Sequence, residues 1–91
     1  MKIRVHALIS GCVQGVCYRA YTCEKAEELG VRGWVRNLHD GRVEAVLEGD
    51  KSSVESLVKC LKSGPAHARV ESIDTTPEDY EGEFRDFTVR Y

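Results

Sequence analysis

Apolar residues alternate with mostly polar ones over residues 2–9, and this period of two predicts a strand with one buried face. Leu8 breaks the alternation by adding an apolar side chain to the polar face, which favours a strand inside a sheet. From about Arg19 the pattern becomes helical, and Gly30 suits the end of this helix. Its apolar face is expected to comprise Ala20, Cys23, Ala26 and Leu29.

Two strands joined by a short loop follow. Gly33–Asn37 predicts the second strand and Arg42–Glu48 the third. The loop contains Asp40-Gly41, a dipeptide that favours a tight hairpin because glycine tolerates positive φ. Taken alone, Asn37 would be interpreted as a turn residue whose side chain bonds its own backbone.

The second helix is the most clearly patterned element of the chain. Asp50 alone, or Ser52 together with Glu55, suits its N-terminus, and Gly64-Pro65 ends it. Its apolar residues recur at intervals of three and four, at Val54, Leu57, Val58 and Leu61.

Two more strands complete the predicted order, at Ala68–Thr75 and Phe84–Tyr91, separated by an acidic solvated loop at Pro77–Glu83. Two helices can both bury an apolar face only if they cover the same side of the sheet. We therefore expect a single domain over residues 1–91, an α+β sandwich of the ferredoxin-like βαββαβ type. It has a mostly antiparallel sheet, right-handed crossovers and an additional C-terminal strand. The spacing leaves open which of the last two strands lies beside the first.

Composition and charge narrow the classes of function. The 91 residues are 42% hydrophobic and 31% charged, as in ordinary globular domains. A net charge of −2 gives no electrostatic support for nucleic-acid binding, and no apolar run is long enough to span a membrane. Because strand alternation starts directly after Met1, without an apolar signal region, we expect a cytoplasmic protein. We also expect a monomer.

A glycine-rich turn, Gly11–Arg19, separates the first strand from the first helix. The first N–H groups of a helix have no partner in its own ladder, so such a turn can direct several of them at one anion. Gly11 and Gly15 remove Cβ atoms that would keep a ligand away, and Arg19 adds a guanidinium suited to phosphate or carboxylate oxygens. The turn predicts an anion-binding site, although a short glycine motif is by itself a weak signal.

The four cysteines, at positions 12, 17, 23 and 60, form no Cys-x-x-Cys pair, and the three histidines are scattered. This pattern argues against a zinc site, and cytosolic thiols are reduced by default. Cys17 lies in the turn at the positive end of the predicted helix, where the pKa of a thiol can be lowered and its thiolate can act as a nucleophile. The alternative, which we favour, is a small residue that contributes only its backbone N–H.

Six segments form one pattern along the chain: Gly11–Arg19, Leu29-Gly30, Gly33–Asn37, Asp40–Glu44, Gly64-Pro65 and Phe87–Tyr91. The combined spacing of these segments resembles the acylphosphatase family. The resemblance runs the whole length of the chain, and its specific part lies between Gly11 and Gly49. Tyr18 departs from the family pattern, which usually has phenylalanine there, but the ring can still pack and its hydroxyl needs a partner only if buried.

The resemblance implies an enzyme that hydrolyses acyl phosphates to carboxylate and inorganic phosphate, with no metal or other cofactor. In such an enzyme Asn37 orients the attacking water, and product phosphate also binds as an inhibitor. A carboxylate leaving group has a conjugate acid with a pKa of about 4, so no general acid need protonate it. The implied phosphoryl-binding groups are the Arg19 side chain and the backbone N–H groups of Gln14, Gly15, Val16, Cys17, Tyr18 and Arg19.

A binding or regulatory module on the same fold is the alternative, because fold does not fix function. A related domain is built into a large enzyme that handles carbamoyl phosphate, whereas this chain stops where the single domain stops, which favours a free enzyme. An RNA-binding version would expose stacking aromatics on its central strands. The first strand instead offers Arg4, His6 and Leu8, and the third offers Glu44 and Glu48.

Overall fold

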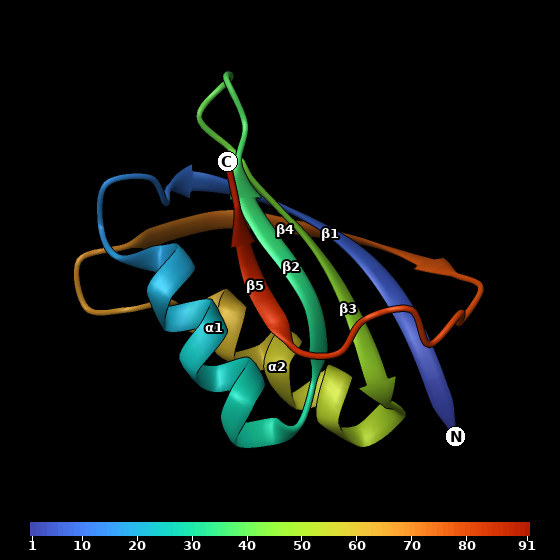
Figure 1. Cartoon of the computed structure of the whole chain (residues 1–91). Helices are drawn as coiled ribbons and strands as arrows, with labels where there is room; N and C mark the ends of the chain where they lie inside the picture. Colours follow the sequence, from blue (N-terminus) through green and yellow to red (C-terminus); the bar gives the residue numbers. More distant parts are fainter.

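The computed structural model describes the whole chain, residues 1–91, as two helices packed on one face of a five-stranded sheet (Figure 1). This arrangement confirms the predicted α+β ferredoxin-like fold with an additional C-terminal strand. In chain order the elements are β1 (Lys2–Cys12), α1 (Tyr18–Leu29), β2 (Arg32–Asn37), β3 (Val43–Asp50), α2 (Lys51–Ser63), β4 (Arg69–Glu78) and β5 (Phe87–Arg90).

The pairing of the strands brings three strand ends together. β1 and β2 each run antiparallel to β3, so they run parallel to each other, and β5 is parallel to β2. The carboxyl ends of β1, β2 and β5 therefore lie at the same end of the sheet. The N-terminus of α1 lies there too, because only residues 13–17 separate it from β1.

The strand order shows which of the last two strands lies beside the first, a point that the sequence spacing left open. β4 pairs with β1 at one edge and β5 pairs with β2 at the other, so β1 is an interior strand, as Leu8 indicated. β4 continues through Pro77, which was predicted to lie in a loop. An edge strand tolerates proline because its outer N–H needs no partner. β5 begins at Phe87, three residues later than Phe84.

The apolar face predicted for α2 is confirmed. It packs into a core that it shares with the inward faces of the strands. Asp50 precedes α2, but its side chain makes no capping bond and lies 3.3 Å from Nζ of Lys2. Neither helix has the length and apolar character needed to cross a membrane. The predicted α2 residues are buried at Val54, Leu57 and Leu61 and half-buried at Val58.

The apolar face predicted for α1 is partly wrong. The buried residues are Tyr18, Thr22 and Ala26, whereas Ala20 is exposed. Thr22 is polar, but its hydroxyl donates to the carbonyl oxygen of Tyr18 at 2.8 Å, and a satisfied hydroxyl can be buried at little cost. Gly30 ends the helix with a φ of 72°, as predicted.

Two tyrosine hydroxyls join α1 to the last turn of α2. Tyr18 is 1% exposed, and its hydroxyl donates to the carbonyl oxygen of Leu61 at 2.7 Å. The residue four positions after Leu61 is Pro65, which has no N–H, so this carbonyl would otherwise lack its helical partner. Tyr21 donates to the carbonyl oxygen of Cys60 at 3.1 Å. Burial raises the pKa of Tyr18, so its hydroxyl stays protonated and able to donate.

Tyr18→Phe is expected to destabilise the domain by about 1 kcal/mol, because it leaves the buried Leu61 carbonyl without a donor. For a domain of this size, such a change lowers the melting temperature by about 4–8 °C. Tyr21→Phe is the matched control and should cost less, since the Cys60 carbonyl keeps the N–H of Gly64 at 2.9 Å. Equal losses in the two variants, measured by thermal unfolding, would contradict this account.

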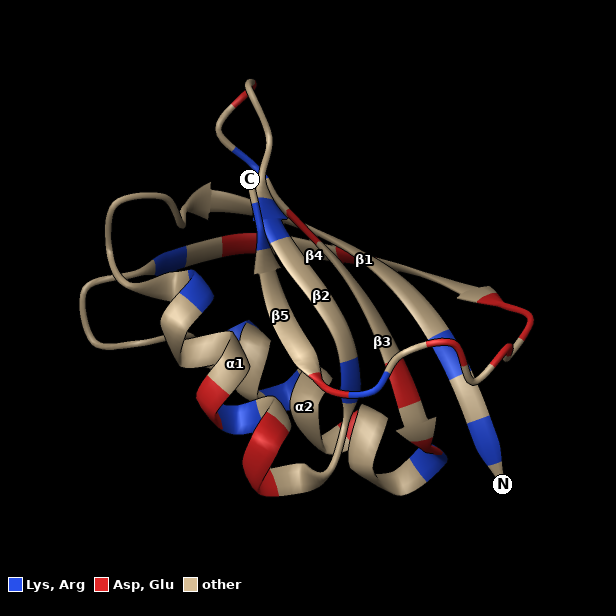
Figure 2. Ribbon diagram, in the orientation of Figure 1, with Lys and Arg blue, Asp and Glu red and all other residues tan.

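The acidic loop between β4 and β5 is tied to the sheet by Glu48, which is 2% exposed. Oε2 of Glu48 accepts hydrogen bonds from the backbone N–H groups of Glu81 and Gly82 at 3.0 and 3.2 Å. Arg4 forms ion pairs with Glu48 and with three carboxylates of this region, those of Glu78, Glu81 and Glu83. Figure 2 shows the acidic segments of the loop beside basic segments of β1. The loop is therefore ordered at the end of the sheet away from the ends of β1, β2 and β5 that lie together.

Candidate active site

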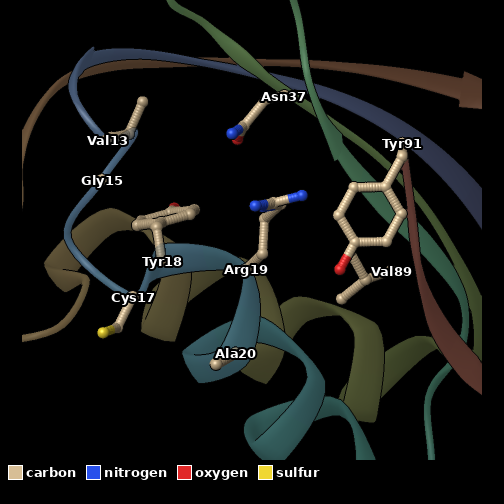
Figure 3. Close-up of a pocket in the computed structure, with 9 residues that line it drawn as sticks. All are labelled: Val13, Gly15, Cys17, Tyr18, Arg19, Ala20, Asn37, Val89 and Tyr91. Atoms are coloured by element: carbon tan, nitrogen blue, oxygen red, sulfur yellow. The ribbon is translucent and has the colours of Figure 1, made fainter.

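A cavity of about 230 Å³ opens where the ends of β1, β2 and β5 meet the start of α1 (Figure 3). The fold thereby brings Asn37 to the glycine-rich turn, as the family resemblance implied. Gln14 lines an adjoining hollow of about 400 Å³ that shares Arg19 and Asn37, whereas Val16 lines neither. The cavity is lined by Val13, Gly15, Cys17, Tyr18, Arg19, Ala20, Asn37, Val89 and Tyr91.

The turn leaves a row of backbone donors unused. None of the N–H groups from Gln14 to Arg19 donates to another backbone group, and the helical ladder begins with Tyr21 N donating to Cys17 O at 3.0 Å. Gly15 and Cys17 both have left-handed backbone conformations, with φ of 73° and 62°. Turns of this kind present successive N–H groups in a concave arrangement that suits an anion.

Arg19 supplies the charge of the cavity. Its side chain is half-buried and forms no ion pair, and no Asp or Glu lines the cavity. Its Cζ lies 5.0 Å from the centre of the Tyr91 ring, a cation–π contact that helps to orient the guanidinium. An uncompensated guanidinium beside unused N–H groups favours an oxyanion ligand.

Asn37 is the last residue of β2, and its side chain points into the same space as Arg19 (Figure 3). Its Oδ1 is buried and has no hydrogen-bond partner. The hairpin after it is closed by other groups: Leu38 N donates to Arg42 O at 2.8 Å, and Arg42 N donates to Asp40 Oδ1 at 3.1 Å. The Asn37 amide therefore does not serve as the cap of its own turn.

Comparisons with known proteins show the family of this chain. The chain matches the acylphosphatase family model over residues 5–89. It is 55% identical over 86 residues to an acylphosphatase of Roseiflexus sp. (strain RS-1), covering 94% of this chain and 92% of that protein. The chain belongs to the acylphosphatase family. The resemblance predicted from the sequence is thus confirmed, and family membership makes the chain a hydrolase that acts on acyl phosphates.

Solved structures of the family have the same fold. The structure superimposes on an acylphosphatase from Bacillus subtilis with a TM-score of 0.94 at 30% identity, covering 98% of this chain and 99% of that one. An acylphosphatase from Coxiella burnetii gives a TM-score of 0.93 at 39% identity, with coverages of 98% and 93%.

The role predicted for Gly11 needs correction, because this residue does not line the cavity. It lies in β1 at an irregularity in the pairing with β4, with a φ of 127°. A Cβ atom there would lie 2.1 Å from the carbonyl oxygen of Arg69. Gly11 is therefore required for the approach of two strands, whereas Gly15 is the glycine that lines the cavity.

Sequence reasoning did not assign Tyr91 and Val89 to the site. Both reach the cavity from the end of β5, which lies beside β2 only in the folded sheet. The segment Phe87–Tyr91 is part of the family resemblance, but no rule of sequence spacing predicts that it lies beside residues 15–19. Val13 and Ala20 complete the lining and were also not assigned.

Cys17 is exposed at the rim of the cavity, and Figure 3 shows its sulfur directed away from Arg19 and Asn37. Cys17 also occupies the position before α1, where its side chain makes no capping bond. The side chain is thus poorly directed for attack on a group held between Arg19 and the turn, which favours the backbone role.

Cys17→Ser is expected to keep most of the activity, since serine retains the backbone N–H and differs little in size. Thiol alkylation should slow turnover only by adding bulk at the rim. The measurement is the initial rate of acetyl phosphate hydrolysis by both proteins before and after alkylation. Abolished turnover in Cys17→Ser, with phosphate binding intact, would instead support a covalent thiol mechanism.

The histidines do not form a catalytic group in the cavity. His6 lies on the open face of the sheet, with Nε2 2.7 Å from Oε2 of Glu44, and this hydrogen bond together with that of Arg36 holds the pKa of Glu44 below its usual value despite partial burial. His39 and His67 are exposed. No group of three or more His, Cys, Asp and Glu side chains is placed to hold a metal ion.

Proposed function

We propose that the cavity binds the phosphoryl group of an acyl phosphate between the Arg19 guanidinium and the backbone N–H groups of residues 14–19. The observation that supports this most directly is the row of unused N–H groups beside an unpaired guanidinium. A phosphoryl group carries negative charge on several oxygens, so fixed donors can contact them together. Donors held in place before the reaction stabilise the transition state without reorganisation.

We assign the orientation of the attacking water to Asn37. Its side chain lines the cavity and points into the same space as Arg19, and its Oδ1 has no partner within the protein, so the amide is free to hydrogen-bond a water molecule. A water held there, opposite a phosphorus atom bound in the turn, has a lone pair free for in-line attack. Asn37 therefore acts mainly in the transition state.

The reaction needs no further catalytic side chain. The water oxygen forms a bond to phosphorus, its proton passes to a phosphoryl oxygen, and the bond from phosphorus to the acyl oxygen breaks. The carboxylate leaves with the bonding electron pair, unprotonated, because its conjugate acid has a pKa of about 4. The products are a carboxylate and inorganic phosphate.

Release of phosphate from acetyl or benzoyl phosphate tests the proposed function. Turnover is expected to survive exhaustive chelation, because Arg19 and backbone dipoles supply the positive potential. Inorganic phosphate should inhibit competitively by binding in the turn. Loss of activity with chelator and its return with zinc or magnesium would mean that the site is misread, and absence of any phosphate release would refute the function itself.

We also propose where the enzyme is located, which class of ligand it binds and its oligomeric state. All four cysteines carry free thiols, the state that a reducing compartment maintains, which supports a cytoplasmic location. The net charge of −2 supports small acyl phosphates rather than nucleic acid as ligands. A single copy of the chain supplies the groups that the proposed reaction uses, Arg19, Asn37 and the unused N–H groups of the turn, so the reaction requires no partner subunit and we expect a monomer.

A further inference from the structure

The Gln14 side chain makes contacts that phosphate binding does not require. Gln14 is half-buried, and its Nε2 donates to the carbonyl oxygen of Leu38 at 2.7 Å and to that of Arg42 at 2.9 Å. A primary amide nitrogen has two hydrogens, so both are used. The side chain thus points to the hairpin that follows β2, while its backbone N–H belongs to the row of unused donors in the turn.

The two carbonyl oxygens that Gln14 contacts lie at the two ends of that hairpin. Each already accepts a backbone bond, Arg42 O from Leu38 N at 2.8 Å and Leu38 O from Gly41 N at 3.2 Å. Gln14 therefore supplies a second donor to each of these two carbonyl oxygens, although it lies far from both residues in the sequence. Leu38 directly follows Asn37, so the Gln14 amide holds the carbonyl of the residue next to the one that carries the unpartnered Oδ1.

We propose that Gln14 is a positioning residue, whose side chain sets the place of Asn37, and hence of the attacking water, relative to the phosphoryl group. This inference rests on the proposed function of the site. The two halves of the site come from different elements, the turn after β1 and the end of β2, and Gln14 is the turn residue whose side chain hydrogen-bonds across to the other half. A misplacement of about 1 Å between reacting groups can cost as much as 10²-fold in rate.

The test is Gln14→Met, which keeps the length of the side chain and removes both donors without adding charge. We expect kcat for acetyl phosphate to fall about tenfold or more, while the phosphate inhibition constant stays within about twofold, because the backbone donors and Arg19 remain. The control is Asp40→Ala, which loosens the exposed outer part of the same hairpin and should leave kcat within about twofold.

A double-mutant cycle with Asn37→Ala separates positioning from a general structural role. If Gln14 acts through Asn37, Gln14→Met should change kcat by less than about twofold in the Asn37→Ala background. Full additivity of the two losses, or a large rise in the phosphate inhibition constant of Gln14→Met, would overturn the inference. If Gln14→Met fails to fold, Gln14→Asn decides by the same cycle, since it keeps the donors on a shorter side chain. An inactive wild-type protein would refute the proposed function, whereas these outcomes all require an active one.

Discussion

Arg19→Gln should reduce kcat/KM for an acyl phosphate on the order of 10²-fold or more, while the domain stays folded. Its guanidinium is the charged side chain of a cavity that no Asp or Glu lines, and it forms no ion pair whose loss would unfold the protein. Both binding and turnover should suffer, because the phosphoryl group is charged before and during the reaction. A hydrogen bond to a charged group contributes roughly 1.5–3 kcal/mol, so phosphate binding should weaken roughly ten- to hundredfold.

The matched control is Arg85→Gln, the same chemical change at an exposed position in the loop after β4. It alters net charge equally but removes no donor from the cavity. The measurements are kcat, KM, the phosphate inhibition constant and the melting temperature of both variants. Near-normal turnover by a folded Arg19→Gln protein would refute the assignment of Arg19.

Asn37→Ala should lower kcat and kcat/KM together, on the order of 10²-fold, and leave phosphate affinity almost unchanged. The reason is that the proposed partner of its amide is the attacking water, which matters in the transition state and little in the ground state. The buried Oδ1 has no partner within the protein, so the substitution breaks no internal hydrogen bond of that atom. Little loss of stability is expected for the same reason.

The contrast between the two variants is informative, because only the arginine should weaken phosphate binding strongly. A purely structural Asn37 would behave differently: its replacement would cost about 1 kcal/mol of stability and little catalysis. Measuring kcat, the phosphate inhibition constant and the melting temperature on one Asn37→Ala sample distinguishes these cases. A destabilised protein with full turnover would rule out the catalytic role.

Local features of the sequence determined most of the fold. Alternation over residues 2–9 and the three–four spacing of α2 depend on side chains that are near neighbours in the chain, and both elements form as predicted. The sequence predictions were wrong where contacts with the rest of the fold outweighed a local sequence rule. α1 buries Thr22 because its hydroxyl finds a partner within the helix, and β4 continues through Pro77 because it lies at an edge.

The candidate site, too, was predicted from the sequence only in part. The sequence by itself determined the glycine-rich turn with Arg19, and the family-like spacing singled out Asn37, because both are contained in short segments. Only the tertiary structure decided that Tyr91 contacts Arg19 and that Gln14 bonds the hairpin. These contacts join residues separated by at least 24 positions, since the shortest, from Gln14 to Leu38, spans that distance. They exist because β1, β2 and β5 run parallel and end together, and strand order is set by the packing of the whole sheet rather than by any local pattern.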